Sequence, residues 1–309
     1  MTRTILLIVH SRREEATKVA SAFASDIQQS GIAVRILEAD REAMVAAGLT
    51  DAQTVSATHA AEGCELAVVF GGDGTILRAA EICHHTDTPL LGVNLGHVGF
   101  LAEADVEDIH HVVRGVVDRT YQVEERLTLD VEVTVGGKVV ATNWALNEAS
   151  VEKAARERML ELVVEIDDRP VSRWGCDGVV CATPTGSTAY NFSAGGPIVW
   201  PEVEALLMVP ISAHALFARP LVVSPASTLA IEVVGEAASG VLWCDGRRAS
   251  ELPPGARVEV RRGARPVHLA RLQNAPFADR LVRKFGLPVA GWRGAAERRM
   301  QDTGTQEDG

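Results

Sequence analysis

Residues 66–84 read LAVVFGGDGTILRAAEICH and combine three local signals. Residues 66–70 form a continuous apolar run, which is typical of a buried strand in a parallel sheet. Three glycines among the next four residues allow the backbone to turn sharply. A helical pattern follows at about 75–84. A strand, a glycine-rich turn and a helix in this order favour an α/β domain with a parallel sheet.

The same alternation extends over the first 125 residues. Short apolar runs at 5–9, 32–37 and 90–93 are further candidates for buried strands. Between the first two runs, apolar residues recur at helical spacing at 16, 19, 20, 23 and 27, and a second helical stretch covers about 105–117. Strands that alternate with helices predict a parallel sheet with crossover connections.

From Leu127 onwards the hydrophobic period changes to two. Apolar residues alternate with polar ones at 127–135 and again at 160–166. Gly136-Gly137 and Asp167-Asp168-Arg169 follow these runs as turn signals. The pattern continues at 139–146, 229–234, 241–244, 258–260 and 267–269. A series of short strands separated by turns predicts an antiparallel sandwich or barrel.

The end of the chain is helical again, since Phe277, Leu281 and Phe285 are spaced four residues apart. One helix cannot form a domain by itself, so we expect it to return to the first domain. The predicted organisation is an α/β domain of residues 1–125 and 275–295 and a β-sandwich-like domain of residues 126–274. Residues 296–309 are polar and are expected to form a disordered tail.

The composition is that of a globular protein, with 47% hydrophobic and 23% charged residues in a chain of 309. The net charge of −11 argues against general binding to nucleic acid or an anionic membrane, which requires positive charge. The charge is uneven, because residues 245–309 hold 13 basic and 8 acidic side chains. We expect Arg247 to reach the functional site and the other basic residues of this stretch to pair with the acidic first domain.

Features of targeting and cysteine use point to the cytoplasm. The apolar run at 5–9 is too short for a signal sequence and lacks a small-residue cleavage site. No run approaches the roughly 18 apolar residues of a spanning helix. The five cysteines are odd in number and show no CxxC spacing, so we expect reduced and mostly buried thiols rather than disulfides or a zinc site.

The Gly71–Thr75 turn is the first candidate for chemistry. Backbone amides in such a turn and at the start of a helix can hold phosphate. A carboxylate inside a phosphate loop would repel the ligand, so Asp73 is expected to hold Mg²⁺ or to accept a proton from an attacking hydroxyl. The alternative is a structural turn in which Asp73 caps the helix. A P-loop is excluded because GxxxxGK[ST] is absent, and a GxGxxG fingerprint is absent as well.

Two further segments are unusual. Residues 183–197, TPTGSTAYNFSAGGP, follow Asp177-Gly178 and are rich in hydroxyl groups and glycine, with a single tyrosine. Such a segment suits a polar ligand with a ring, although a surface loop of turn formers has the same composition. Asn147-Glu148, at the end of a predicted strand, could hold sugar hydroxyls but is uninformative alone.

In combination these motifs resemble those of the NAD kinases. The similarity covers about residues 66–250 and includes GGDGT, NLGHVGF at 94–100, Asn147-Glu148 and DG followed by TPTGSTAY. GGDGT is shared with phosphofructokinases and with diacylglycerol and sphingosine kinases, whereas TPTGSTAY singles out this family. The fold implied by the resemblance is an α/β domain and a β-sandwich with the site between them.

The resemblance implies transfer of a phosphoryl group from ATP, inorganic polyphosphate or both to the 2′-hydroxyl of the adenosine ribose of NAD, giving NADP. Asp73 would be the catalytic base, and Gly71, Gly72, Gly74 and Thr75 would form the phosphate-donor loop. The residues expected to bind NAD are Asp73, Gly74, Arg78, Asn147, Glu148, Arg158, Asp177, Thr188, Ala189, Tyr190, Asn191, Phe192, Ser193 and Arg247. Arg158 and Arg247 lie in looser motifs, and Asp245-Gly246-Arg247 is equally well explained as a hairpin turn.

Mg²⁺ or another divalent cation is expected with the donor phosphates and without a dedicated protein site. The family also implies a homodimer or homotetramer. His97 is a candidate near the site, and His10-Ser11-Arg12-Arg13 could contact donor phosphates or be solvated. Two rival functions remain at this stage: a lipid or sugar kinase with GGDGT, which would not depend on residues 183–193, and a non-catalytic NAD(P)-binding sensor.

Overall fold

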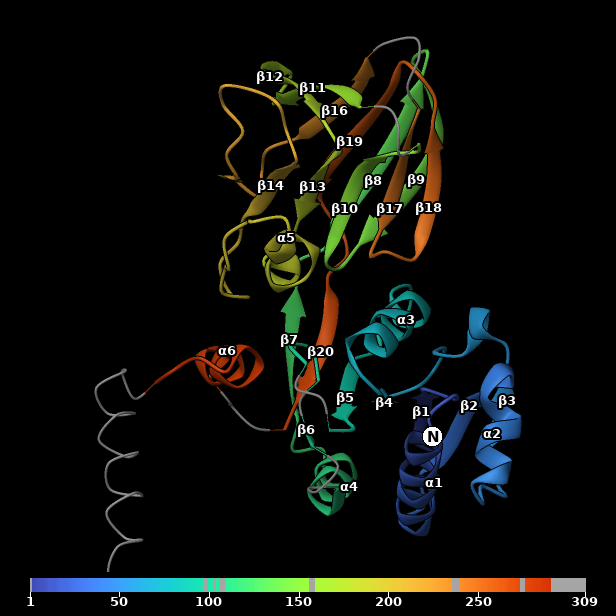
Figure 1. Cartoon of the computed structure of the whole chain (residues 1–309). Coiled ribbons are helices and arrows are strands. Elements are labelled where there is room, and N and C mark those ends of the chain that lie inside the picture. The colour runs from blue at the N-terminus through green and yellow to red at the C-terminus, as the bar shows by residue number, and fades with distance from the viewer. Residues whose placement is uncertain are drawn as a thin grey trace, which may run out of the picture.

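Two domains make up the chain in the computed structural model (Figure 1). The structure describes residues 2–96, 99–102, 104–105, 109–155, 159–234, 239–272 and 276–289. In Figure 1 a sandwich of two sheets lies above an α/β domain, and strands β7 and β20 run between the two. No helix in the described part of the chain is long and apolar enough to span a membrane.

The amino-terminal domain is built on one mixed, mostly parallel sheet. Strands β1, β2, β3, β4 and β5 pair in parallel with their neighbours, β20 pairs in parallel with β5, and β7 closes the edge antiparallel to β20. The order across the sheet is β3 (Gln53–Val55), β2 (Ala33–Leu37), β1 (Thr4–Val9), β4 (Leu66–Phe70), β5 (Leu90–Asn94), β20 (Val267–Arg271) and β7 (Gln122–Arg126), with β6 (Ala104–Asp105) also paired to β5.

Helices cover both faces of this sheet, which explains its uninterrupted apolar strands. Along β1, Ile5, Leu7 and Val9 pack with α1 (Glu14–Gln29), α2 (Arg41–Ala46) and α4 (Ile109–Asp118). Leu6 and Ile8 point to the other face, where α3 (Asp73–Cys83) packs. The α/β domain predicted from residues 66–84 is therefore confirmed as a three-layer arrangement.

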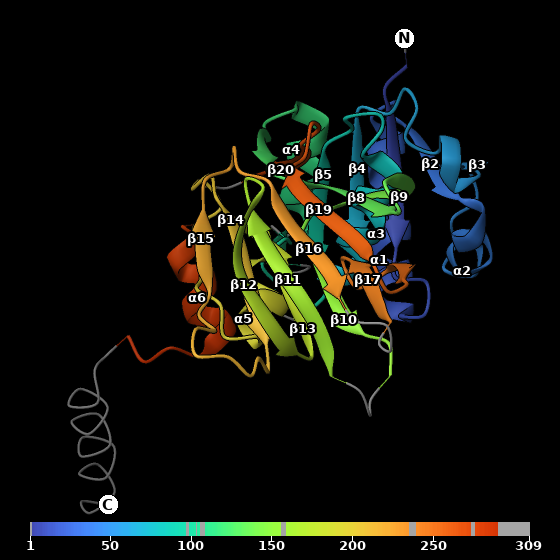
Figure 2. The ribbon, with the colours of Figure 1, turned by 90° about the horizontal axis from the view of Figure 1, so that it is seen from above.

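The second domain is an antiparallel sandwich, as the period of two predicted. One sheet contains β15 (Leu221–Val223), β14 (Leu206–Ile211), β13 (Gly178–Ala182), β10 (Glu148–Lys153), β17 (Gly240–Cys244) and β18 (Arg248–Leu252). The other contains β12 (Arg169–Cys176), β11 (Leu160–Ile166), β16 (Leu229–Val234), β19 (Ala256–Arg262), β8 (Leu129–Val135) and β9 (Lys138–Ala145). Figure 2 shows the two sheets from above.

The turns of the sandwich follow the residues that predicted them. Gly136 and Gly137 adopt φ values of 57° and 75° between β8 and β9, and Asp167 and Asp168 adopt 52° and 59° between β11 and β12. Two consecutive residues in the left-handed region match the right-handed twist of a two-residue hairpin, and glycine and aspartate tolerate that region.

The predicted boundary at residue 274 is wrong. The chain returns to the first domain as strand β20 at Val267, because β20 fills the place between β5 and β7. The alternation of residues 267–269 predicts a strand correctly, yet a period of two does not tell which sheet the strand joins. The helical stretch predicted at about 105–117 is α4, described from Ile109 to Asp118, and residue 105 belongs to strand β6 instead.

The predicted carboxyl-terminal helix is α6 (Phe277–Phe285), and it contacts both domains. Phe277 and Phe285 pack against Phe100 of the first domain at ring-centroid distances of 5.9 and 5.8 Å. On the other side, Phe285 contacts Phe192 at 4.7 Å and Phe277 contacts Trp200 at 5.2 Å. The helix therefore sits at the boundary (Figure 1). The tail predicted for residues 296–309 lies outside the described residues.

Candidate active site

The glycine-rich turn lies at the switch point of the parallel sheet. After β1 the chain continues to β2 and β3 toward one edge of the sheet, and after β4 it continues to β5 toward the other edge. The chain segments that follow β1 and β4 therefore run in opposite directions. Ligands of open α/β sheets bind in the crevice at the carboxyl ends of such strands. Gly71 follows β4 directly, and a Cβ there would lie 2.4 Å from Thr75 Oγ1, so only glycine fits this turn.

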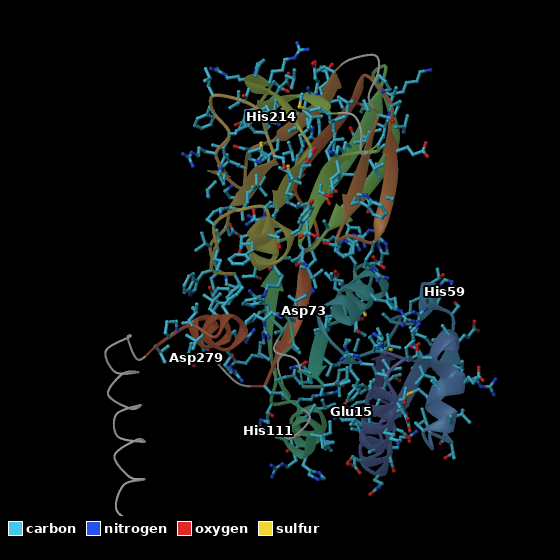
Figure 3. All side chains as sticks on the ribbon, viewed as in Figure 1. Glu15, His59, Asp73, His111, His214 and Asp279 are labelled. Carbon is cyan, nitrogen blue, oxygen red and sulfur yellow. The ribbon has the colours of Figure 1, made fainter. Side chains whose placement is uncertain are left out.

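Asp73 is the first residue of helix α3 and does not cap it. The alternative role of Asp73 as a helix cap is therefore excluded. The cap position is Gly72, with no side-chain cap. The Asp73 carboxylate instead accepts hydrogen bonds from the backbone N–H groups of Phe100 and Leu101, both at 3.1 Å. Gly99 permits this contact, because a Cβ there would lie 2.4 Å from Asp73 Oδ1. The backbone at Phe100 and Leu101 thus fixes the orientation of the Asp73 side chain. Figure 3 labels Asp73 near the domain boundary.

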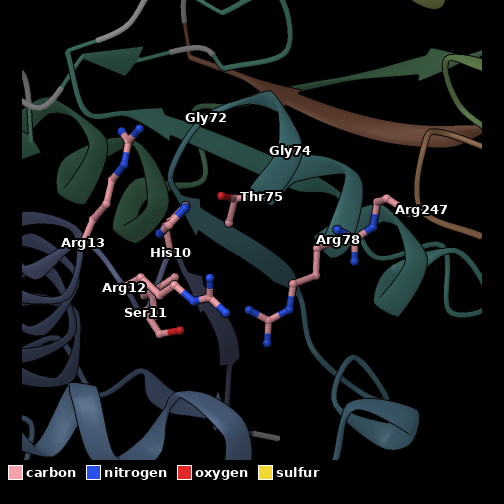
Figure 4. A pocket seen from close by; sticks show the side chains of 10 residues that line it. His10, Ser11, Arg12, Arg13, Gly72, Gly74, Thr75, Arg78 and Arg247 are labelled. Carbon is pink, nitrogen blue, oxygen red and sulfur yellow. The ribbon is translucent and has the colours of Figure 1, made fainter.

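A cavity of about 650 Å³ opens at the switch point (Figure 4). It is lined by Val9, His10, Ser11, Arg12, Arg13, Gly72, Gly74, Thr75, Arg78 and Arg247. Arg78 pairs with Asp40 at 3.4 Å, and Arg247 pairs with Glu81 at 3.0 Å. Arg12 and Arg13 form no ion pair with any residue that the structure describes. The cavity therefore presents uncompensated positive charge beside the glycine turn, which suits a polyphosphate ligand.

Asn147 and Glu148 lie where β9 gives way to β10, and the turn is held from outside by Asp245. The Asp245 carboxylate accepts hydrogen bonds from the N–H groups of Leu146 at 3.0 Å and Asn147 at 2.7 Å. Asp245 is at the β17–β18 hairpin with a φ of 53°, so the interpretation of this segment as a hairpin turn is confirmed. Its side chain also organises the Asn147-Glu148 turn, which the sequence alone did not indicate.

Glu148 is a buried carboxyl group with 7% of its surface exposed. Burial, followed by the negative charge of Asp245, raises its pKa to about 8, against the opposing effect of the Tyr190 N–H. Its Oε2 atom has no hydrogen-bond partner among the described residues. Glu148 therefore carries a proton at neutral pH and can donate a hydrogen bond as well as accept one.

The segment after β13 packs tightly on this turn. Thr183 donates from its hydroxyl to Leu146 O at 2.6 Å, and its backbone N–H donates to Asn147 O at 2.9 Å. A Cβ on Gly186 would lie 1.9 Å from Asn147 O. The expected loop is partly helical, with one short turn at Thr185–Thr188 followed by α5 (Tyr190–Ser193). The two predicted NAD-binding motifs are thus brought together.

Members of this segment differ in what their side chains offer. Tyr190 is half-buried, and its pKa is raised by burial and then by the nearby charges of Glu152, Glu148 and Asp177. Asn191 is fully buried, and its side-chain amide donates to the carbonyl oxygens of Ser187 and Pro197, so it braces the segment. Phe192 is 41% exposed and contacts α6. Thr188 and Ala189 are half-buried, and Ser193 is exposed.

Not all predicted residues lie at the Asn147-Glu148 turn, although Asp177 is near enough to Tyr190 for its charge to raise the pKa of that phenol. Asp177 precedes β13, at the end of the strand opposite Thr183, and forms an ion pair with Lys153 at 2.5 Å that lowers its pKa. Strand β13 has five residues, so roughly 17 Å separate the two ends. A contact of Asp177 with a ligand at Glu148 stays a prediction. Arg158 and His97 lie outside the described residues.

The fold and the site together are those of a two-domain phosphotransferase with a basic cavity at the switch point of an α/β sheet. Comparison with known proteins makes this specific. Residues 5–121 match the family model of the ATP-NAD kinase N-terminal domain, and residues 146–272 match that of the ATP-NAD kinase C-terminal domain. The chain is 59% identical to NAD kinase 2 of Streptomyces coelicolor over 293 residues, which cover 95% of this chain and 97% of the relative.

A second relative, the NAD kinase of Thermobifida fusca, is 59% identical over 304 residues, which cover 96% of this chain and 93% of that protein. The crystal structure of yeast NADH kinase complexed with NADH has the same fold, with a TM-score of 0.86 at 23% identity over 94% of this chain and 89% of that one. The chain belongs to the NAD kinase family, whose members are phosphotransferases.

Proposed function

We propose that this protein transfers a phosphoryl group to the 2′-hydroxyl of the adenosine ribose of NAD and so forms NADP. One observation carries the proposal: Asp73 stands at the start of α3, between the basic cavity lined by Gly72, Gly74 and Thr75 and the loop of Phe100 and Leu101 that orients its carboxylate. A carboxylate beside a phosphate site can align an acceptor hydroxyl and take its proton.

The acceptor would bind on the side of the second domain. Protonated Glu148 can donate a hydrogen bond to a ribose hydroxyl or a carbonyl oxygen while its other oxygen accepts one. The ring of Tyr190 offers a flat surface to an adenine or nicotinamide ring. These neutral groups suit a nucleotide that already carries negative phosphates, because an ionised Glu148 would repel them.

The donor would bind in the basic cavity, with its phosphates on the amides of the Gly71–Thr75 turn and on Arg12, Arg13 and Arg78. A cavity of about 650 Å³ is large enough for a triphosphate or a segment of polyphosphate. We propose that ATP, inorganic polyphosphate or both serve as the donor. The archaeal NAD kinase from Archaeoglobus fulgidus, whose structure contains ATP, shares this fold at a TM-score of 0.66 and 23% identity.

We also propose that Mg²⁺ acts with the donor. The described residues contain no group of three or more His, Cys, Asp or Glu side chains that could hold a metal ion. Asp73 is the carboxylate adjoining the cavity, and Mg²⁺ commonly binds through substrate phosphates, water and one or two carboxylates, so the residues fit a donor-borne ion. The ion would neutralise phosphate charge, while Asp73 and the loop amides align the reacting groups.

The assembly and cellular location are proposed as well. Leu216 and Phe217, on the connection between β14 and β15, are exposed, and a homodimer or homotetramer would cover them. Light scattering of the purified protein measures this directly. All five cysteines are free, and four of them are buried, which supports a location in the reducing cytoplasm.

The deciding experiment supplies NAD and Mg²⁺ with ATP or with polyphosphate in separate reactions and measures NADP. NADP from either donor supports the proposal and identifies the donor. Absence of NADP from both donors would overturn it. A lipid or sugar kinase would phosphorylate another acceptor regardless of Tyr190, whereas a sensor would bind NAD with no turnover.

A further inference from the structure

A network of four charged side chains joins the two domains beside the site. On the helix side, the Glu81 carboxylate of α3 accepts hydrogen bonds from Arg247 Nε at 3.0 Å and from Arg247 Nη2 at 3.2 Å. It also accepts a short hydrogen bond from Arg248 Nη1. Arg248 Nη2 lies 2.9 Å from Asp245 Oδ2. Two carboxylates and two guanidinium groups therefore balance in charge across the domain boundary.

On the sandwich side the network ends at the Asn147-Glu148 turn. Asp245 is buried and holds this turn by the N–H groups of Leu146 and Asn147. Arg248 holds the end of β9 that leads into this turn, since Nη2 donates to Trp144 O at 2.6 Å and Nε donates to Asn143 Oδ1 at 2.9 Å. Burial of the Asp245 charge is compensated by Arg248, so removal of Arg248 would leave a carboxylate with one fewer partner.

On the other side the network ends at the helix that carries Asp73. Glu81 lies eight residues after Asp73 on α3, a separation of about 12 Å along the axis of one rigid helix. A second contact supports the same junction, because the ring of His84, which directly follows the last residue of α3, stacks on Trp144 with centroids 3.8 Å apart. The guanidinium carbon of Arg248 lies 4.8 Å from the centre of the Trp144 ring. Figure 1 shows α3 directly below β10, β17 and β18.

We propose that Glu81 and Arg248 are positioning residues for phosphoryl transfer, which fix helix α3, and with it Asp73, relative to the Asn147-Glu148 turn. The inference rests on the proposed function, because it assigns the acceptor to this turn and the base to α3. The two parts belong to different domains, so their alignment depends on contacts that cross the boundary. Glu81 and Arg248 make that contact without lying in the loops that touch the substrates.

Measurements of kcat and of the Kd for NAD distinguish a positioning role from a role in domain stability alone. The Glu81→Gln variant removes the charge from the helix side and leaves Asp245, Asn147 and Glu148 in place. We expect kcat to fall about 10- to 100-fold, since small misplacements of reacting groups cost this much. The Kd for NAD, measured by calorimetry, should stay within twofold of the wild type because the turn is intact.

The Arg248 variants test the other half of the network. Arg248→Met should lower kcat and also weaken NAD binding, because it disturbs both α3 and the turn. The Glu81→Gln/Arg248→Met double variant should lose less kcat than the two single losses combined, since both changes break the Glu81–Arg248 pair and only Glu81→Gln also breaks the pair with Arg247. Arg248→Lys keeps the charge but not the planar fork, so it should recover part of the NAD affinity and little of the kcat.

A matched control is Glu161→Gln. It removes a similar carboxylate from an ion pair with Arg173 at 2.6 Å, on the sandwich sheet that contains β11 and β12. It should leave kcat and Kd unchanged. The inference is overturned if Glu81→Gln keeps kcat within twofold of the wild type, or if kcat falls only in proportion to the folded fraction seen in thermal melts. A wild type that forms no NADP would overturn the proposed function as well, which is a distinct result.

Discussion

At the scale of single residues, Asp73 is defined by what holds its carboxylate. Two backbone N–H groups, from Phe100 and Leu101, each donate to one of its oxygens. These contacts fix the direction of the carboxylate. A carboxylate prepared in this way needs no conformational change before it aligns an acceptor hydroxyl, which is the property required of a base in phosphoryl transfer.

Asp73→Asn is expected to cut kcat by about 10²- to 10⁴-fold, the usual scale for loss of a general base. The Kd for NAD should change little, because Asn147, Glu148 and Tyr190 remain. Steady-state kinetics and calorimetry measure the two quantities. Asp168→Asn, at an exposed turn position, is the matched control and should behave as the wild type. Turnover of Asp73→Asn equal to that of the wild type would contradict the assignment.

Glu148 makes the free energy of unfolding decrease as pH rises, which is opposite in sign to the effect of a carboxylate whose pKa is lowered by folding. Its folded pKa of about 8 lies above the unfolded value of 4.5, so between these pH values the folded state holds a proton that the unfolded state has lost. Stability is then greatest at the acidic end and decreases as pH rises toward 8. His84 opposes this up to pH 6.5, because burial lowers its folded pKa to about 4.

The window that isolates Glu148 is therefore pH 6.5 to 8. We expect the free energy of unfolding to fall with pH there, by at most about 1.4 kcal/mol per pH unit. Urea titrations at several pH values measure the slope. Glu148→Gln, a neutral isostere of the protonated acid, should abolish it. A wild-type stability that is flat or rises across this window would show that Glu148 is ionised in the folded state.

At the scale of elements, helix α6 supports the loop that orients Asp73. Phe277 and Phe285 pack on Phe100, and Arg280 Nη1 donates to Phe100 O at 3.2 Å. The adjacent residue of this loop, Leu101, is held by Arg271 of β20, because Arg271 Nη1 donates a hydrogen bond to Leu101 O at 3.5 Å. The carboxyl-terminal elements therefore contribute to the site without lining the cavity.

Phe285→Ala is expected to loosen this loop more than the rest of the protein. The ring is half-buried, so we expect a loss of about 1 to 2 kcal/mol, below the cost for a fully buried phenylalanine. Hydrogen exchange at the N–H groups of Phe100 and Leu101 should accelerate, and kcat should fall. Val289→Ala, at a position 79% exposed, is the control. Unchanged protection of both amides in Phe285→Ala would disprove the supporting role.

The elements also show what the sequence could and could not predict. Alternation of apolar residues found the sandwich strands, and glycine or aspartate pairs found their turns, because both signals are local. The placement of β20 was missed because it depends on a free edge of β5, far away in the chain. Glu81 and Arg248 were missed for the same reason, since they lie 167 positions apart and neither belongs to a recognisable motif.

At the scale of the whole molecule, the expected pairing of the basic carboxyl-terminal stretch is correct only in part. Arg248 does pair with Glu81 of the first domain, and Arg247, which was expected at the functional site, lines the cavity and pairs with Glu81 as well. Arg257 and Arg262 instead pair with Glu165 and Glu204 of the sandwich. Both arginines lie on β19, whereas Glu165 lies on β11 and Glu204 just precedes β14, so their partners belong to the sandwich and not to the first domain.

The net charge of −11 opposes the approach of any polyanionic donor, so local cations must provide the attraction. Arg12 and Arg13 are suited to this because they line the cavity and have no described carboxylate partner, whereas Arg78 and Arg247 are already paired. We expect Arg12→Ala and Arg13→Ala each to raise the KM for the donor severalfold and to leave the KM for NAD unchanged. Initial rates at varied donor concentration measure this.

Ionic strength separates the local attraction from the field of the whole molecule. Salt screens exposed charges beyond about 8 to 10 Å, so raising it should weaken donor binding by the wild type through Arg12 and Arg13. In the Arg12→Ala/Arg13→Ala double variant the remaining long-range field is repulsive, and added salt should then have little effect or lower the KM for the donor. Arg173→Ala, on strand β12 of the sandwich, serves as the control for loss of one positive charge. A salt dependence identical in the wild type and the double variant would mean that these two arginines do not bind the donor.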